Sequence, residues 1–376
     1  MADQPRGAES AVLKQLAAEG VTLWLSGASR RELVNGALRS AVSRTGITGA
    51  VLSARTLGRE VRERELYLER INRLSFAGVS PAQAMRSLCV DDARWACDIL
   101  RPAFDETSGA TGHVSVDLDP RLAHDAAATV REAQALYAAV GRPNLLIKVP
   151  ATAAGVRALS DCLFEGVGVN ATLVYSLKRY EEVLDAYFDG LDRMADAGRE
   201  IAGVGSVASF DVFRLGEELD ERLGEPDGAG GVRGKSAVAF ACLAYQVYED
   251  RLGSPQWRHL RAKGARPQRL AWAEGDGTEP DSRRDSLIRK IIAWNTVHTV
   301  TRATLESPGW YGDLQGDSLT GGRDRAARVR DGLARLGISP ETVAAELEAE
   351  GVGTLTESWT RTLGDVGSAL GRDGRR

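Results

Sequence analysis

The sequence has few of the features that mark disulfide-rich, disordered or polyanion-binding proteins. It contains only four cysteines, and they include no CxxC pair, so neither a disulfide framework nor a structural zinc site is expected. Prolines number 12 and charged residues make up 27%, a composition that excludes disorder over most of the chain. The 48 basic residues do not exceed the 52 acidic ones, and the net charge is −4, so nucleic acid is not an expected partner.

Long apolar segments are also missing. No run approaches the roughly 18 residues that a membrane span needs, so no membrane association is expected. Residues 1–8 lack the apolar stretch of a signal peptide. We therefore expect a cytoplasmic protein with reduced, mostly buried thiols. No Pro/Gly/Ser-rich linker divides the 376 residues, which predicts a single domain over 1–376.

Short apolar runs alternate with longer helical segments along the chain. The expected strands are 21–25, 48–53, 113–118, 144–150, 167–175, 204–210, 269–273 and, more weakly, 296–300. The expected helices are 29–42, 57–76, 81–105, 122–140, 153–163, 177–197, 212–223, 234–251, 281–292 and a final region at 323–370.

Several of these strands are near-continuous apolar runs, for example at Leu145-Leu146-Ile147, which is typical of parallel strands covered on both faces. Repeated strand–helix units predict either a doubly wound sheet or a closed (β/α)8 TIM barrel. Eight candidate strands favour the α/β barrel, with additional N-terminal and C-terminal helices. The region 323–370 is expected to pack on the barrel, because Val329, Leu333 and Leu336 recur at helical spacing.

Common nucleotide and hydrolase motifs do not fit. Gly234-Lys235-Ser236 looks like the end of a Walker A loop, but Ala229 stands where a glycine is required and a helix precedes the loop. No GxGxxG follows a strand, and no GxSxG is present.

Lys148 is the most informative single residue. It interrupts an apolar strand near its carboxyl end, where a barrel has its active site. Burying an ammonium is costly unless it is paired or loses its proton, and a neutral amine is the nucleophile of Schiff-base chemistry. A lysine that extends to solvent from a strand end explains the pattern equally well.

Other polar groups stand at matching places on neighbouring strands. Asp117 ends the third strand, while Asn170 and Thr172 share one face of the fifth. Ser206, Ser209 and Arg214 mark the end of the sixth strand and the following helix, where an arginine near a helix N-terminus suits an anion. Their convergence favours an active site over satisfied core positions.

Longer stretches carry a family resemblance. They are 92–97, 114–124, 144–152, 169–176, 206–210, 265–269 and 295–297. Together they resemble transaldolase, in its long actinobacterial form, from about Val21 to the C-terminal helices. The resemblance implies a TIM barrel whose Schiff-base lysine is Lys148, and Asn170, Thr172, Ser209 and Arg214 match its pattern.

Five positions depart from that pattern. Ser26 stands where the family has Asp, and Leu52-Ser53-Ala54 stands where it has Ser-Asn-Pro. Asp117 takes the place of a Glu, Asp211 that of an aromatic residue, and Thr278 that of a basic residue. An aldol cleavage through an imine needs an amine, a base for the hydroxyl beside the breaking bond, and a proton shuttle. Lys148 supplies the amine, and Asp117 with Thr172 is expected to supply the shuttle. Ser26 has no useful basicity, so weak activity on ordinary sugar phosphates is expected.

Three hypotheses follow from these substitutions. The first is a Schiff-base enzyme repurposed for another sugar or carbonyl substrate in specialised metabolism, with Ser26, Ser53 and Asp211 among its substrate-binding residues. The second is a catalytically silent homologue retained for binding, and the third is an ordinary transaldolase of the pentose phosphate pathway. Asp211 is expected to take over part of the base's work or to bind a cationic group, and to disfavour a phosphate nearby.

The remaining expectations concern the histidines, cofactors and assembly. His298 either enters the pocket as an acid–base group or fills the eighth strand. No metal or organic cofactor is expected, since the lysine itself provides the electron sink. The sequence leaves open whether the chain forms a homo-oligomer.

Overall fold

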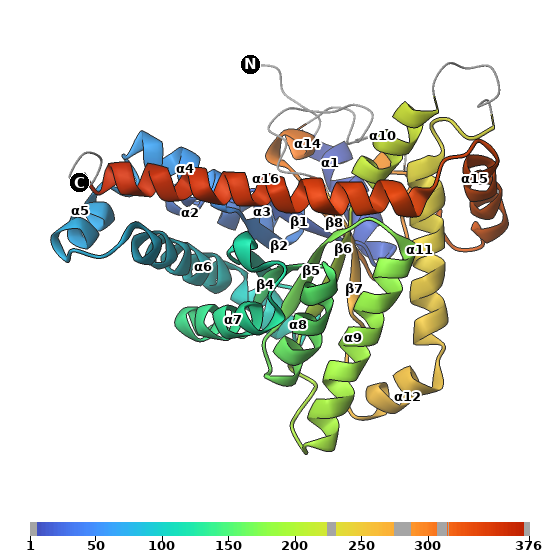
Figure 1. Cartoon of the computed structure of the whole chain (residues 1–376), viewed down its shortest axis with the longest axis horizontal. Coiled ribbons are helices and arrows are strands. Elements are labelled where there is room, and N and C mark those ends of the chain that lie inside the picture. Colours follow the sequence, from blue (N-terminus) through green and yellow to red (C-terminus); the bar gives the residue numbers. More distant parts are fainter. Residues whose placement is uncertain (1–5, 224–230, 274–286, 307–313, 315, 372–376) are drawn as a thin grey trace.

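Eight parallel strands close into a barrel in the computed structural model, which describes residues 6–223, 231–273, 287–306, 314 and 316–371 (Figure 1). Each strand pairs with the next, and the last pairs with the first. The strands are β1 (Thr22–Ser26), β2 (Ile47–Leu52), β3 (His113–Asp117), β4 (Leu145–Pro150), β5 (Val169–Val174), β6 (Ser206–Phe210), β7 (Arg269–Trp272) and β8 (Thr296–Val300). The expected (β/α)8 barrel is confirmed.

Helices connect the strands and extend both ends of the chain. They are α1 (Arg6–Ala18), α2 (Arg30–Val34), α3 (Ala37–Thr45), α4 (Ala54–Glu63), α5 (Leu68–Phe76), α6 (Pro81–Glu106), the 3-10 turn η1 (Pro120–Leu122), α7 (Ala126–Val140), α8 (Ala153–Phe164), α9 (Leu177–Asp196), α10 (Val212–Arg222), α11 (Ser236–Leu252), α12 (Pro255–Ala262), α14 (Arg302–Glu306), α15 (Arg323–Arg335) and α16 (Pro340–Ala369). None of these described helices is long and apolar enough to cross a membrane.

Three of the expected helices have different bounds. The helix at 29–42 is interrupted at Gly36, whose φ of +76° leaves the helical region, although the expected capping box of Ser29 and Glu32 is present. The helix at 57–76 is two helices, because Arg64 adopts a φ of 62° between them. The helix at 122–140 starts at Ala126, where the Asp125 side chain caps it.

Half of the expected helix at 281–292 lies outside the described residues, and the described residues 289–292 are not helical. Helices α12 and α14 were not predicted.

Alternating strand residues separate the barrel interior from its outer shell. Trp24, Val51, Leu146, Val207, Ala271 and Val297 form one buried cluster, to which six of the strands contribute one residue each. Residues of the opposite parity, such as Ile147 and Val169, belong to the large cluster shared with the helices. The interior is therefore packed with side chains, and the space for a ligand lies at the ends of the strands.

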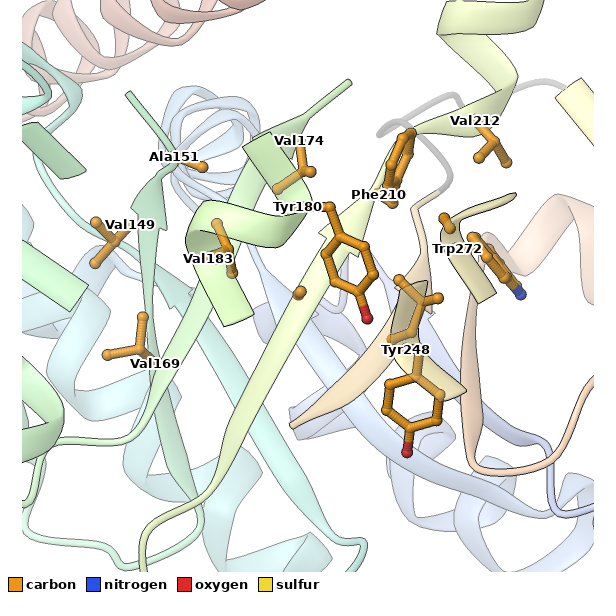
Figure 2. Packing of buried hydrophobic residues seen from close by; sticks show 14 of the residues in the cluster. Val149, Ala151, Val169, Val174, Tyr180, Val183, Phe210, Val212, Tyr248 and Trp272 are labelled. Atoms are coloured by element: carbon orange, nitrogen blue, oxygen red, sulfur yellow. The ribbon is translucent and has the colours of Figure 1, made fainter. Parts of the chain in front are cut away.

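The outer face of β4 packs against α7 and α8, and the outer faces of β5 and β6 pack against α9 (Figure 2). The Tyr180 ring of α9 meets Phe210 of β6 edge-on, with 6.1 Å between the ring centroids. Each fully buried side chain of this size contributes about 1.5–3 kcal/mol to folding. This shell fixes the strands and so fixes the polar residues at their carboxyl ends.

Helix α16 runs across the carboxyl ends of the strands (Figure 1). Thr362 on it donates a hydrogen bond to the Ala54 carbonyl of α4 at 2.9 Å. Four of its carboxylates meet arginines of the barrel and its helices, in the pairs Arg62–Asp365, Arg179–Glu348, Arg214–Glu350 and Arg222–Glu346. The C-terminal region thus packs over the barrel mouth, where the sequence suggests an active site.

Candidate active site

Lys148 lies on β4 with its side chain at the barrel mouth. It is in register with Asp117 on β3 and with Asn170 on β5, so three polar side chains meet at one level of the barrel. The Lys148 Nζ is 2.7 Å from Oδ1 of Asp117, and the lysine side chain is 18% exposed. The amine is thus paired with a carboxylate and also borders a cavity. A lysine that merely extends to solvent would show neither feature.

Asp117 is held from both sides. Its Oδ2 accepts a hydrogen bond from the Ala54 N–H at 2.9 Å, in the first turn of α4. Backbone N–H groups at a helix N-terminus favour negative charge. The carboxylate is therefore fixed between a helix start and the amine.

Asn170 is oriented by two serines inside the barrel. Its Nδ2 donates to Ser115 Oγ at 3.0 Å, and its Oδ1 accepts from Ser209 Oγ at 2.8 Å. All three side chains are buried. The network sets the rotamers of Asn170 and Ser209 at the edge of the cavity.

Thr172 lies beside a break in the β5 ladder. The register shifts between Ala171 and Val174, and Leu173 adopts a φ of +57°, which is unusual for a leucine. Bulges of this kind re-aim side chains next to active sites. Thr172 and Lys148 both line the two cavities at the barrel mouth.

The larger of these cavities has a volume of about 320 Å³. It is lined by six other predicted site residues besides Lys148: Ser26, Asn170, Thr172, Ser209, Asp211 and Arg214. The smaller one, of about 40 Å³, adds Ser53 and Asp117. The structure thus brings together all nine predicted site residues, whose chemical roles stay predictions.

Asp211 and Arg214 form the far end of the larger cavity. The Asp211 side chain caps α10 by accepting the Arg214 N–H at 2.9 Å. The Arg214 guanidinium lies 3.5 Å from a carboxylate oxygen of Glu350 and 3.6 Å from one of Glu218. Its positive charge is therefore shared with two carboxylates of the same chain.

Sequence patterns did not reveal several residues that line the larger cavity. They are Arg55 from α4, Thr299 from β8, and Leu347, Glu350, Gly351, Thr354 and Leu355 from α16. The apolar spacing of 323–370 predicts packing on the barrel but not which end of the barrel is covered. For Arg55 a signal existed, since it stands three residues after Leu52, the last residue of β2.

Two other positions lie elsewhere, and a third falls outside the described residues. Val297 faces the barrel interior and Thr299 faces the cavity. His298 stands between them on β8, so its side chain points outward, and it is a buried packing residue of that strand. Burial lowers the pKa of His298 to about 3. Ser206 bonds to Gln268 and the Val169 carbonyl at the opposite end of β6. Thr278 lies outside the described residues.

Metal ligands do not gather at this site. Within the described ranges, no three His, Cys, Asp or Glu side chains are grouped so that they could hold a metal ion. Among the described residues, the groups that line the two cavities include an amine, carboxylates, guanidinium groups, an amide and hydroxyls.

A (β/α)8 barrel with a lysine amine beside a carboxylate at its mouth has the groups that covalent binding of a carbonyl compound requires. The family model described as "Transaldolase/Fructose-6-phosphate aldolase" matches residues 29–366. The chain belongs to this family and is an enzyme of the transaldolase/aldolase type.

The sequences of actinobacterial relatives align with almost the whole of this chain. A protein of Acidothermus cellulolyticus named transaldolase is 41% identical over 96% of this chain and 97% of its own length. One of Thermobifida fusca, also named transaldolase, is 39% identical over 95% and 98%. "Transaldolase 1" of Streptomyces coelicolor is 38% identical over 98% and 97%. The resemblance to the long actinobacterial form is confirmed, and these names favour an ordinary transaldolase over a repurposed enzyme.

Proposed function

We propose that this chain is a transaldolase that works through an imine between the Lys148 amine and the ketone of a sugar phosphate. The position of Lys148 carries the proposal: its Nζ lies 2.7 Å from Asp117 beside the cavity at the barrel mouth. The net charge of −4 supports a small substrate over nucleic acid, and the four free cysteines support a cytoplasmic location.

Imine formation begins when Asp117 takes a proton from the Lys148 ammonium. The neutral amine adds to the ketone carbon, and the carbonyl oxygen becomes the hydroxyl of a carbinolamine. The carboxyl of Asp117 returns the proton to that hydroxyl, which leaves as water and gives the iminium. Thr172, which lines both cavities, orients the water for this transfer.

Cleavage then requires a base for the hydroxyl on the carbon beyond the breaking bond. When that proton is removed, the hydroxyl becomes an aldehyde carbonyl, the C–C bond breaks, and its electron pair moves to the iminium to form an enamine. Ser26 lacks the basicity for this step. Asp117 is the carboxylate in contact with the reacting nitrogen, so we assign the step to it, directly or through one water.

Transfer is completed by the reverse steps on a second aldehyde. The enamine carbon attacks that aldehyde and the new alkoxide takes up the proton, and water then hydrolyses the iminium to release the product from Lys148. We assign substrate hydroxyl binding to Ser26, Ser53, Asn170 and Ser209, while Asp211 and Arg214 contact the far end of the substrate.

Turnover of a ketose phosphate with an acceptor aldehyde, in the wild type and in Lys148→Arg, tests the proposal. Arginine keeps the charge beside Asp117 but cannot form the imine, so we expect activity to vanish while the thermal unfolding midpoint is retained. Equal activity in both proteins contradicts the Schiff-base mechanism. A wild type that gives neither turnover nor any adduct with carbonyl compounds identifies the silent homologue instead.

A further inference from the structure

We propose that Leu355 of α16 keeps water away from the covalent intermediate, so that the chain passes its enamine to a second aldehyde instead of hydrolysing it. The inference rests on the proposed function and adds to it a specificity-determining residue, which decides the fate of the intermediate and not its formation. It follows from the place of Leu355 where the two cavities meet, and from the way its packing differs from that of Leu363 on the same helix.

Leu355 lies on the stretch of α16 that crosses the barrel mouth (Figure 1). Thr354 and Leu355 line both the small and the larger cavity, as Lys148 does, and Leu355 is the apolar one of the two helix residues. It follows Gly351 by four residues and Leu347 by eight, so the three share one face of the helix, and all three line the larger cavity. Leu355 therefore stands where the two cavities meet, on the side that the helix covers.

The helix is held close to the strands at this point. A Cβ added to Gly351 would lie 2.9 Å from a methyl carbon of Leu173, the β5 residue with a φ of +57°. Before this point Leu347 is buried in the large core cluster, and after it Thr362 donates a hydrogen bond to a carbonyl of α4. Leu355 lies between these two anchors, so its side chain is held at the barrel mouth.

Core packing does not account for a leucine at this position. Leu355 is half-buried and belongs to none of the hydrophobic clusters that the described residues form, either as a member or as a residue packed against one. Leu363, two turns further along α16, is also half-buried but packs against the cluster that α16 shares with α4, α5 and α6. Leu355 instead borders a polar site, where its apolar side chain offers no hydrogen bond to a water that would need several polar partners.

The chemistry that this cover decides is the fate of the enamine. After the first aldehyde leaves, the enamine carbon either takes a proton from water or attacks a second aldehyde. In the first case the iminium forms again and hydroxide adds to its carbon. As the C–N bond of the resulting carbinolamine breaks, the hydroxyl proton moves to nitrogen, which releases the ketone and the Lys148 amine.

This hydrolytic route consumes one water for each ketone released and makes no new C–C bond. Transfer consumes no water before the new C–C bond has formed. A closed site prevents hydrolysis of a reactive intermediate, so an apolar cover over the cavity favours transfer.

The ratio of hydrolysis to transfer measures the effect of this cover. Hydrolysis is the rate at which dihydroxyacetone is released from fructose 6-phosphate without an acceptor, while the other product aldehyde is removed by enzymatic reduction. Transfer is the rate at which a new ketose phosphate forms when erythrose 4-phosphate is the acceptor. We expect Leu355→Ala to raise the ratio about tenfold. Leu355→Asn keeps the volume, offers water a hydrogen-bond partner and should raise the ratio as well.

Two controls accompany these variants. Leu355→Met keeps an apolar cover of similar volume and should leave the ratio within about twofold of the wild-type value. Leu363→Ala makes the same change on the same helix, at a residue that lines neither cavity, and should also leave the ratio unchanged. A merely structural role of Leu355 would lower both rates together and would not move their ratio.

The outcomes separate this inference from the proposed function. An unchanged ratio in both Leu355→Ala and Leu355→Asn overturns the role of Leu355 while the Schiff-base reaction stands. A rise of equal size in Leu363→Ala overturns it too, and so does a wild type that hydrolyses fructose 6-phosphate as fast as it transfers the fragment. If borohydride traps no adduct of fructose 6-phosphate on the wild-type chain, the proposed function itself fails.

Discussion

Lys148 and Asp117 face each other as register partners on β4 and β3, with 2.7 Å between the amine nitrogen and Oδ1. The second oxygen of Asp117 accepts the Ala54 N–H of α4. A surface ion pair of this length contributes little to stability. This pair lies at a cavity and is fixed before substrate arrives, and the role that we propose for it is proton transfer.

Asp117→Asn tests that role. The amide keeps the size of the side chain and can still accept the Ala54 N–H, but it cannot take a proton from the lysine. We expect the rate of imine formation, followed by rapid-quench borohydride trapping, to fall about 10²–10⁴-fold. Asp119→Asn is the control, because Asp119 pairs with Arg121 outside the cavities. A rate within a factor of two of wild type would assign the proton transfer elsewhere.

Ser26→Asp tests whether a missing base limits cleavage. Ser26 ends β1 and lines the Lys148 cavity, so a carboxylate there reaches the substrate's hydroxyl. We expect turnover to rise by up to about 10²-fold. Ser26→Asn has the same shape without the basicity and should show no gain. If both variants turn over at the wild-type rate, Asp117 already serves cleavage fully and position 26 does not limit it.

Two buried histidines predict acid sensitivity of the fold. Burial lowers the pKa of His113 and of His298 to about 3, with the charges of Arg269 and Arg266 adding to the effect at His113. Neither ring nitrogen of His113 has a hydrogen-bond partner in the described part of the chain. Each pKa is lower in the folded state than in the unfolded state. The stability that each neutral histidine contributes is therefore complete above about pH 6.5 and is lost as pH falls toward 3.

Within that pH window, the free energy of unfolding falls by about 1.4 kcal/mol per pH unit of acidification for each histidine. Urea unfolding between pH 7 and pH 4.5 measures it, and His298→Leu should remove the share of one histidine. His124→Leu changes an exposed histidine and should keep the wild-type slope. Parallel slopes in the wild type and His298→Leu would show that this group is not held neutral.

The contact between α16 and α4 is predicted to be sensitive to a single methyl group. A Cβ at Gly58 would lie 2.5 Å from Thr362 Oγ1, which is itself bonded to the Ala54 carbonyl. At Gly364 of α16, nothing lies within 4 Å of that position. Gly58→Ala should lower the free energy of unfolding by about 1–3 kcal/mol, whereas Gly364→Ala should raise it by about 0.5–1 kcal/mol. Equal stability of the two variants would mean that α16 does not pack tightly on α4.

The strands and the place of Lys148 at the barrel mouth could be predicted from sequence because their signals are local. A mostly apolar run defines β4, and a lysine within such a run stands out without any knowledge of its neighbours. The break at Arg64 could not be predicted, because no glycine or proline marks it and its positive φ appears only in three dimensions. The expected single helix at 57–76 was wrong for that reason.

The contributions of α16 to the site depend on contacts between distant parts of the chain. Glu350 reaches Arg214 across 136 residues of sequence, and no periodicity predicts which end of a barrel a terminal helix will cover. Arg214 follows a helix start, as the local pattern predicts, and only the structure shows that its guanidinium also lies beside Glu218 and Glu350.

The most direct test of the account is the intact mass of the protein after borohydride reduction with a ketose phosphate, followed by peptide mapping of the modified lysine. The account predicts one adduct per chain with the mass of the ketose phosphate bound through a reduced imine, located on Lys148 and missing from Lys148→Arg. An unmodified chain, or an adduct that maps to an exposed lysine and persists in Lys148→Arg, would contradict it.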